Sequence, residues 1–249
     1  MPEQIIGNKI ISNDEILSTN TFAVNLLKHE RPCEGTIIST KKQTGGRGHG
    51  ANQWESEPGM NLTISIILYP DFLKADEQFF LSMAMSLGIK DFLELFTGNI
   101  FIKWPNDIYV SDDKIAGILI ENSISGNSFD YCITGIGINI NQKEFTEDAP
   151  NPISLTQITG IDYSLDDSLD LLCRQLDFRY TQIKNGGSRQ RIKRNYLENL
   201  YRYQKFVQFK CKNRKFTAKI TGIDPSGRLI LREKNGKINK FGFHEVSFA

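Results

Sequence analysis

A glycine-rich segment is the part of the sequence best suited to binding a small anion. Residues 43–50 read Gln-Thr-Gly-Gly-Arg-Gly-His-Gly and follow an apolar stretch that ends near Thr40. Glycines at this density let backbone N–H groups approach an anion closely, and the planar guanidinium of Arg47 can hold a carboxylate or a phosphate. The pattern is not a Walker A loop, because the Lys-Ser/Thr pair is missing. The alternative interpretation is a surface loop whose glycines only permit turns.

A second polar group stands at the end of an apolar stretch. Residues 103–107 read Lys-Trp-Pro-Asn-Asp, and Lys114 follows Asp107 by seven residues. Because proline cannot donate to a strand ladder, Pro105 should end one strand and leave the next polar side chains facing a pocket. A tight hairpin would then place Asp107 and Lys114 on neighbouring strands, with Gly117 allowing close approach of a ligand. The alternative is an ordinary surface Lys–Asp pair across two strands.

Two further motifs have both a functional and a structural interpretation. Gly135 and Gly137 alternate with isoleucines. Glycines two residues apart in a strand leave one face of it without side chains, so that either a ligand or a packed helix can approach closely. The run Ser18-Thr19-Asn20 precedes an apolar stretch and, taken alone, is an ordinary helix N-cap.

The elements that must position these residues are mainly short strands. The expected strands are β-branched or apolar runs bounded by Gly, Pro, Asn and Asp: residues 36–40, 61–68, 100–104, 107–110, 115–121 and 131–140. Only a turn separates Val110 from Lys114, so these two strands must be antiparallel, since a parallel return needs a longer crossover.

Helices are expected where apolar residues recur three or four positions apart. Such patterns begin after Asn20, at Phe79 and at Leu165, and a last one runs from Ile192 to Leu200, with Asp76 and Ser164 as expected N-caps. Helices mixed with mainly antiparallel strands predict an α+β fold, with a mixed, largely antiparallel sheet and helices packed on it.

The end of the chain differs in pattern and in charge. After Tyr203 the apolar residues alternate at period two, with turns at residues 224–227 and 235–236, which predicts a small β-barrel. We therefore divide the chain into a domain at 1–200 and a barrel at 201–249. The barrel carries twelve Lys or Arg and three acids, and its phenylalanines 206, 209, 216, 241 and 243 fall mainly on the core parity. An RNA-binding barrel is the alternative.

Composition limits the class of protein. The formal net charge is only +1, so the overall field does not favour nucleic acid strongly. The four cysteines, at 33, 132, 173 and 211, lack C-x-x-C spacing and are expected to be reduced. We find no signal-peptide pattern and no run of roughly 18 apolar residues, which favours the cytoplasm and no membrane.

Taken in order, these motifs resemble those of biotin protein ligases. The resemblance covers roughly residues 15–160 and rests on Ser18-Thr19-Asn20, Gln43-Thr44-x-Gly46-Arg47-Gly48, Trp54, Asn61-Leu62, residues 103–107, Lys114-x-x-Gly117, Gly135-x-Gly137-x-Asn139 and Ser154-Leu155. It implies a catalytic domain like that of biotin ligases and class II aminoacyl-tRNA synthetases, followed by an SH3-like barrel.

The resemblance also implies a reaction and its substrates. Biotin and ATP, with Mg²⁺, would form biotinyl-5'-AMP, and a lysine of a biotin carboxyl carrier domain would then accept the biotin. Matched by position, the residues that bind biotin are Ser18, Thr19, Asn20, Gln43, Gly46, Arg47, Gly48, Lys114, Gly117 and Gly135. Those that bind ATP or the adenylate are Arg47, His49, Trp54, Lys103, Asn106, Lys114 and Asn139. Lys114, Arg47 and Asp107 are the expected catalytic residues, with Asp107 orienting or deprotonating the acceptor lysine.

The sequence departs from the family pattern at two places. His49 and Asn52 stand where many relatives have arginine, so we expect weaker retention of the adenylate, partly restored below about pH 6.5 if His49 becomes charged. Only seventeen residues precede Ser18, too few for the DNA-binding module of some relatives, so we expect no DNA binding. We expect a monomer or a weak homodimer. The rival functions are a lipoate or octanoate ligase of the same fold and a biotin sensor without transfer.

Overall fold

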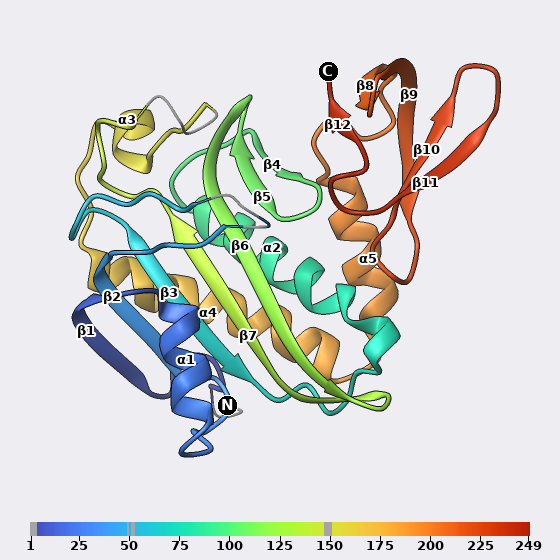
Figure 1. Cartoon of the computed structure of the whole chain (residues 1–249). Coiled ribbons are helices and arrows are strands. Elements are labelled where there is room, and N and C mark those ends of the chain that lie inside the picture. Colours follow the sequence, from blue (N-terminus) through green and yellow to red (C-terminus); the bar gives the residue numbers. More distant parts are fainter. Residues whose placement is uncertain (1–3, 49, 51–52, 147–150) are drawn as a thin grey trace.

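The computed structural model of the chain describes residues 4–48, 50, 53–146 and 151–249. The described residues form one mixed seven-stranded sheet with helices on both faces, and a separate five-stranded sheet at the end of the chain (Figure 1). This architecture confirms the predicted α+β class and the small C-terminal barrel.

The main sheet has the strand order β1-β2-β3-β7-β6-β5-β4. Its strands are β1 (Ile10–Ile16), β2 (Ile37–Gln43), β3 (Leu62–Leu68), β4 (Ile100–Lys103), β5 (Asp107–Val110), β6 (Asp113–Ser125) and β7 (Ser128–Ile138). All neighbouring pairs are antiparallel except β1 and β2. Strand β1 was not predicted, because its polar residues, such as Asn13 and Asp14, lie on a half-exposed edge strand.

The helices cover the two faces unequally. The helices are α1 (Thr19–Leu27), α2 (Phe79–Leu93), α3 (Leu155–Thr159), α4 (Leu165–Lys184) and α5 (Arg189–Glu198). Helix α1 packs on one face of β2, β3 and β7, while α2, α4 and α5 pack together against the opposite face (Figure 1). Ser164 caps α4 as predicted, by accepting a hydrogen bond from Asp167 N. The prediction for Asp76 was wrong, because this residue lies inside a short 3-10 turn and Gln78 occupies the N-cap position of α2.

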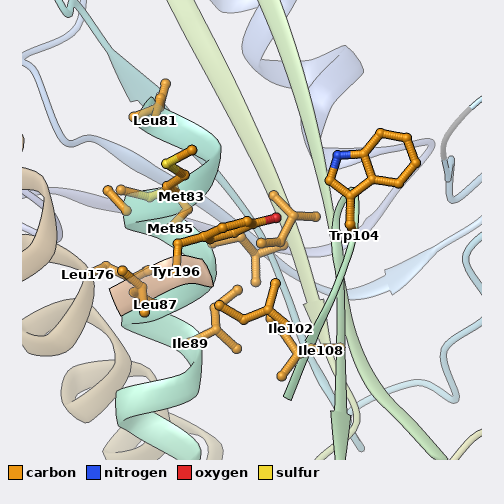
Figure 2. Close-up of a cluster of buried hydrophobic side chains, with 14 of the residues drawn as sticks. Leu81, Met83, Met85, Leu87, Ile89, Ile102, Trp104, Ile108, Leu176 and Tyr196 are labelled. Atoms are coloured by element: carbon orange, nitrogen blue, oxygen red, sulfur yellow. The ribbon is translucent and has the colours of Figure 1, made fainter. Parts of the chain in front are cut away.

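The larger core lies between α2 and the strands that end at the site. Figure 2 shows Leu87 of α2 near Leu176 of α4, and Ile89 of α2 facing Ile102 and Ile108. Tyr196 points from α5 towards the same strands. All of these side chains are buried. Dense packing of this kind resists displacement, so the ends of β4 and β5 are held at fixed positions.

The barrel strands follow the predicted alternation. They are β8 (Val207–Cys211), β9 (Arg214–Ile223), β10 (Leu229–Glu233), β11 (Ile238–Phe241) and β12 (Ser247–Phe248). Phe209 and Phe216 are buried, whereas Phe206 and Phe243 are 46% and 39% exposed, so the expectation that the aromatics are mainly core holds only for part of them. The indole Nε1 of Trp104 donates to Gly227 O at 2.9 Å, and this bond attaches the barrel to the main domain.

Two predictions from composition can be compared with the described residues. All four cysteines are free, and Cys132 and Cys173 are buried as small apolar side chains. Within the described part of the chain, no helix has the length and apolar character needed to cross a membrane.

Candidate active site

A cavity of about 410 Å³ lies between the main sheet and the barrel, and it brings most of the predicted site residues together. Its lining includes Ser18, Thr19, Asn20, Gln43, Arg47, Gly48, Trp54, Lys103, Asn106, Asp107, Lys114, Gly117 and Gly135. Arg47 and Lys114, which come from separate parts of the chain, therefore face one space. Gly46 and Asn139 lie beside it without contributing to its described lining.

The β5–β6 hairpin pairs the predicted acid with the predicted lysine. Lys114 Nζ lies 2.7 Å from Asp107 Oδ1, and both side chains are about one quarter exposed, at 23% and 25%. The backbone of Lys114 is fixed by two hydrogen bonds: its amide N–H donates to Asn151 O, and its carbonyl O accepts from Ile153 N. An ammonium has three donors, so a lysine that spends one on Asp107 keeps two for a ligand.

Lys103 supplies a second cation beside this pair. Its Nζ donates to Tyr109 Oη at 2.7 Å and lies 4.3 Å from the centre of the Tyr109 ring. Burial lowers the pKa of the Lys103 ammonium below its ordinary value of 10.5, while the nearby Asp107 acts in the opposite direction. A partly desolvated cation interacts more strongly with an anion than one in bulk water.

The two predicted asparagines are engaged with backbone. Asn106 Nδ2 donates to Ile118 O at 2.7 Å, and Asn139 Nδ2 donates to Ile153 O at 3.1 Å. Asn139 thus fixes the segment that also bonds to the backbone of Lys114. The proposed contact of Asn106 and Asn139 with the nucleotide stays a prediction.

Glycines form a flat floor on which Trp54 lies. Gly117 and Gly137 are directly opposite each other on β6 and β7. A Cβ atom on Gly137 would lie 2.2 Å from Trp54 Cε2, and one on Gly117 would lie 3.2 Å from Trp54 Cζ3. The stripped strand face therefore seats a side chain of the protein itself. Trp54 Nε1 is buried and has no partner among the described residues.

The start of α1 presents polar side chains towards the cavity. Ser18 occupies the N-cap position of α1, as its sequence context predicted, but its side chain makes no capping hydrogen bond. Thr19 N and Thr19 Oγ1 both donate to Gln43 Oε1, at 2.8 and 3.2 Å. Ser18, Thr19 and Asn20 are at most 4% exposed. Buried polar groups of this kind discriminate strongly between ligands that satisfy them and ligands that do not.

The glycine-rich loop is tied to the segment before α1. Thr44 N donates to Ile16 O and Gly45 N to Leu17 O, so these two amides are already used. Gly46 must lack a side chain, because a Cβ there would lie 2.3 Å from Trp54 O. The predicted anion cradle thus begins at Gly46. His49 and Asn52, where the sequence departs from the family, lie outside the described residues.

Three features of the site were not predicted. Glu121 accepts hydrogen bonds from Asn20 and Arg47. Residues 117, 119 and 121 share one face of β6, because strand side chains alternate between the two faces. This shared face with Gly117 was the sequence signal that could have identified Glu121. Ser65 is one of two polar residues, with Thr63, in the fully buried strand β3, and it contacts Thr19 and Asn20. The barrel provides part of the wall, through Phe209, Leu229, His244, Val246, Ser247 and Phe248, and nothing in the local sequence indicates this.

The described side chains offer no ready-made metal centre. Among them, no three or more His, Cys, Asp or Glu residues are grouped as metal ligands. A magnesium ion that enters with a nucleotide needs few protein ligands, because it keeps waters and is held by the phosphates. Mg·ATP as a substrate is compatible with this site.

The comparisons with known proteins agree with this geometry. Residues 14–139 match the biotin/lipoate A/B protein ligase family, and residues 206–248 match the C-terminal domain of biotin protein ligases. The bifunctional ligase/repressor BirA of Bacillus spizizenii is 32% identical over 94% of this chain and 72% of its own length. The biotin–[acetyl-CoA-carboxylase] ligase of Paracoccus denitrificans is 29% identical over 80% of this chain and 85% of its own.

A solved structure extends the likeness to the whole fold. The biotin protein ligase of Aquifex aeolicus in complex with biotin and ATP superposes with a TM-score of 0.80, at 26% identity, over 97% of this chain and 99% of that one. The chain belongs to the biotin/lipoate A/B protein ligase family. Its C-terminal match confirms the resemblance to the biotin protein ligases within that family.

Proposed function

We propose that this chain is an ATP-dependent biotin–protein ligase, which forms biotinyl-5'-AMP and then transfers biotin to a lysine of a biotin carboxyl carrier domain. The observation that carries the proposal is the position of Arg47 and Lys114 on one cavity, next to the buried polar residues of α1. Cations suit both the carboxylate of biotin and the phosphates of ATP, and the polar residues suit the ureido ring.

In the first step a biotin carboxylate oxygen attacks the α-phosphorus of Mg·ATP. The bond from the α-phosphorus to the bridging oxygen breaks, and pyrophosphate leaves. Two anions must approach each other, and Arg47 and Lys114 would offset their repulsion while holding the reacting atoms together. Lys103, with Trp54 on its glycine floor, would bind the nucleotide side.

In the second step the amine of the carrier lysine attacks the acyl carbon of the adenylate. The bond from that carbon to the phosphate oxygen breaks, AMP leaves, and the attacking nitrogen loses a proton. An ammonium is not nucleophilic, so a base must be near. Asp107 is our candidate for orienting or deprotonating the amine, since its second carboxylate oxygen can accept while Oδ1 stays bonded to Lys114.

The carrier partner, the magnesium ion and the cellular compartment belong to the same proposal. A carrier domain is the expected acceptor because the reaction needs a protein lysine. The four free cysteines support a reducing compartment, and we place the activity in the cytoplasm. We retain the expectation of a monomer or a weak homodimer.

Isotope exchange between ATP and pyrophosphate tests the first step without any carrier. We expect exchange that depends on biotin and that lipoate neither supports nor inhibits. Exchange supported by lipoate and not by biotin would assign the chain to the lipoate side of the family. Tight biotin binding without any exchange would instead favour a sensor.

A further inference from the structure

A single carboxylate oxygen connects two predicted ends of the biotin site. Glu121 Oε2 accepts a hydrogen bond from Asn20 Nδ2 at 2.7 Å and another from Arg47 Nη2 at 2.7 Å. The three residues come from β6, α1 and the glycine-rich loop, so this oxygen joins elements far apart in the sequence. Both bonds are charge-assisted, which makes them stronger than bonds between neutral groups.

The carboxylate fixes which way the Asn20 amide points. A carboxylate only accepts, so the NH₂ group of Asn20 must face Glu121 and its carbonyl must face Ser65. Ser65 Oγ lies 2.5 Å from Asn20 Oδ1 and 2.7 Å from Thr19 Oγ1. The single hydroxyl proton of Ser65 faces both Asn20 Oδ1 and Thr19 Oγ1, and Thr19 Oγ1 donates its own proton to Gln43 Oε1. Thr19 Oγ1 then keeps a lone pair for an N–H group of a ligand.

The same carboxylate holds the guanidinium of Arg47 at the cavity. The bond to Glu121 uses one of its five N–H donors, so the others remain able to bind a carboxylate. Arg47 and Glu121 have side chains 46% and 37% exposed. An exposed pair of this kind contributes little to folding stability. Its main effect is therefore to restrict where the guanidinium can lie.

We propose that Glu121 is a positioning residue for biotin. It sets the hydrogen-bond direction of the chain Asn20–Ser65–Thr19 at the ureido end and holds Arg47 at the carboxylate end. This inference rests on the proposed function, because it assigns those two ends to biotin. Glu121 itself need not touch the ligand.

Two variants test the proposal, Glu121→Gln and Glu121→Ala. Biotin binding is measured by calorimetry without ATP, and the KM values for biotin and ATP by ATP–pyrophosphate exchange. Removing a residue that orients ligand-binding groups typically weakens binding about 10- to 100-fold in metal sites, and we expect about that rise in the biotin Kd and KM for Ala. Gln should fall between Ala and the parent, since its carbonyl can accept one of the two bonds. The KM for ATP should rise less than that for biotin, because Arg47 is expected at both substrates whereas Asn20 is expected only at biotin, and the thermal midpoint should stay near that of the parent.

Asp130→Asn is the matched control, because Asp130 is a carboxylate on neighbouring β7 that bonds to Ser123 and lies outside the cavity lining. An unchanged biotin Kd in both Glu121 variants would overturn the proposal, as would equal losses for biotin and ATP. If the Ala variant does not fold, the Gln variant decides by the same criteria. Calorimetry needs no turnover, so failure of the proposed ligase activity would show separately, as a parent protein that binds biotin without exchange.

Discussion

Replacing Gly137 by alanine should damage the nucleotide side of the site through Trp54. The new methyl carbon would lie 2.2 Å from Trp54 Cε2 and 2.5 Å from Trp54 Cζ2, whereas ordinary contacts lie at 3.4–4 Å. The two groups must separate by roughly 1.5 Å, which is about the difference between an overlapping and a normal carbon contact. Strand β7 is held between β3 and β6, so we expect the indole to move.

The cost can be bounded from the packing. Forcing an extra carbon into a packed position costs about 1 to 3 kcal/mol. If that free energy is lost from the stacking of Trp54 with the nucleotide, ATP binding weakens roughly 5- to 150-fold, at about 1.4 kcal/mol for each factor of ten. Biotin binding should change much less, because Thr19 and Gln43 do not contact the indole in any hydrogen bond among the described residues.

The KM for ATP in the exchange assay and the tryptophan emission spectrum measure the effect. Gly222→Ala is the control, since a Cβ at this strand glycine would meet only Ile230 Cδ1 at 3.7 Å. A Gly137→Ala protein with the parent's ATP KM and the parent's emission would refute the idea that the glycine floor positions Trp54.

Three further predictions concern titration, reactivity and stability. Because burial lowers the pKa of Lys103, its charge should be lost at a lower pH than the charge of a free lysine, whose pKa is 10.5. The KM for ATP should therefore begin to rise before the pH reaches 10.5. Lys103→Arg should flatten this rise, since arginine stays charged; a parallel rise in the variant would exclude Lys103 as the cause. Burial raises the pKa of Cys132 and of Cys173 to about 12, so a thiol reagent at neutral pH should modify exposed Cys33 and spare these two until the chain unfolds, as peptide mapping would show. Tyr196 is buried and its hydroxyl has no partner among the described residues, so Tyr196→Phe should raise the free energy of unfolding by about 1 kcal/mol, whereas a fall in the thermal midpoint would mean that the hydroxyl is satisfied.

Local spacing predicted the parts of the site that lie within one hairpin or one turn. Asp107 and Lys114 could be paired from the sequence because Pro105 ends β4 and a short turn returns the chain. The alternation of glycines indicated a stripped strand face, yet it could not tell whether a ligand or Trp54 would cover it.

Contacts between distant elements were beyond the reach of sequence patterns. Glu121 lies in a strand whose local pattern does not reveal that Asn20 and Arg47 converge on it. The polar edge strand β1 was not predicted, because it forms only by pairing with a parallel strand 27 residues later, as Ile10 does with Ile37. The barrel wall of the cavity depends on docking through Trp104 and Gly227, which no periodicity encodes.

Mass spectrometry of a carrier domain incubated with this protein, biotin, ATP and Mg²⁺ tests the central claim most directly. We expect one added biotinyl group on a single lysine with the parent and with Lys42→Ala. That control removes a cross-strand Lys–Glu pair, to Glu15 at 2.8 Å, whose two residues are not part of the cavity lining. With Lys114→Ala the product should fall by at least about 100-fold, since a cation acting in a partly dry site supplies about 3 kcal/mol or more. Unmodified carrier with the parent, or full modification with Lys114→Ala, would contradict the account.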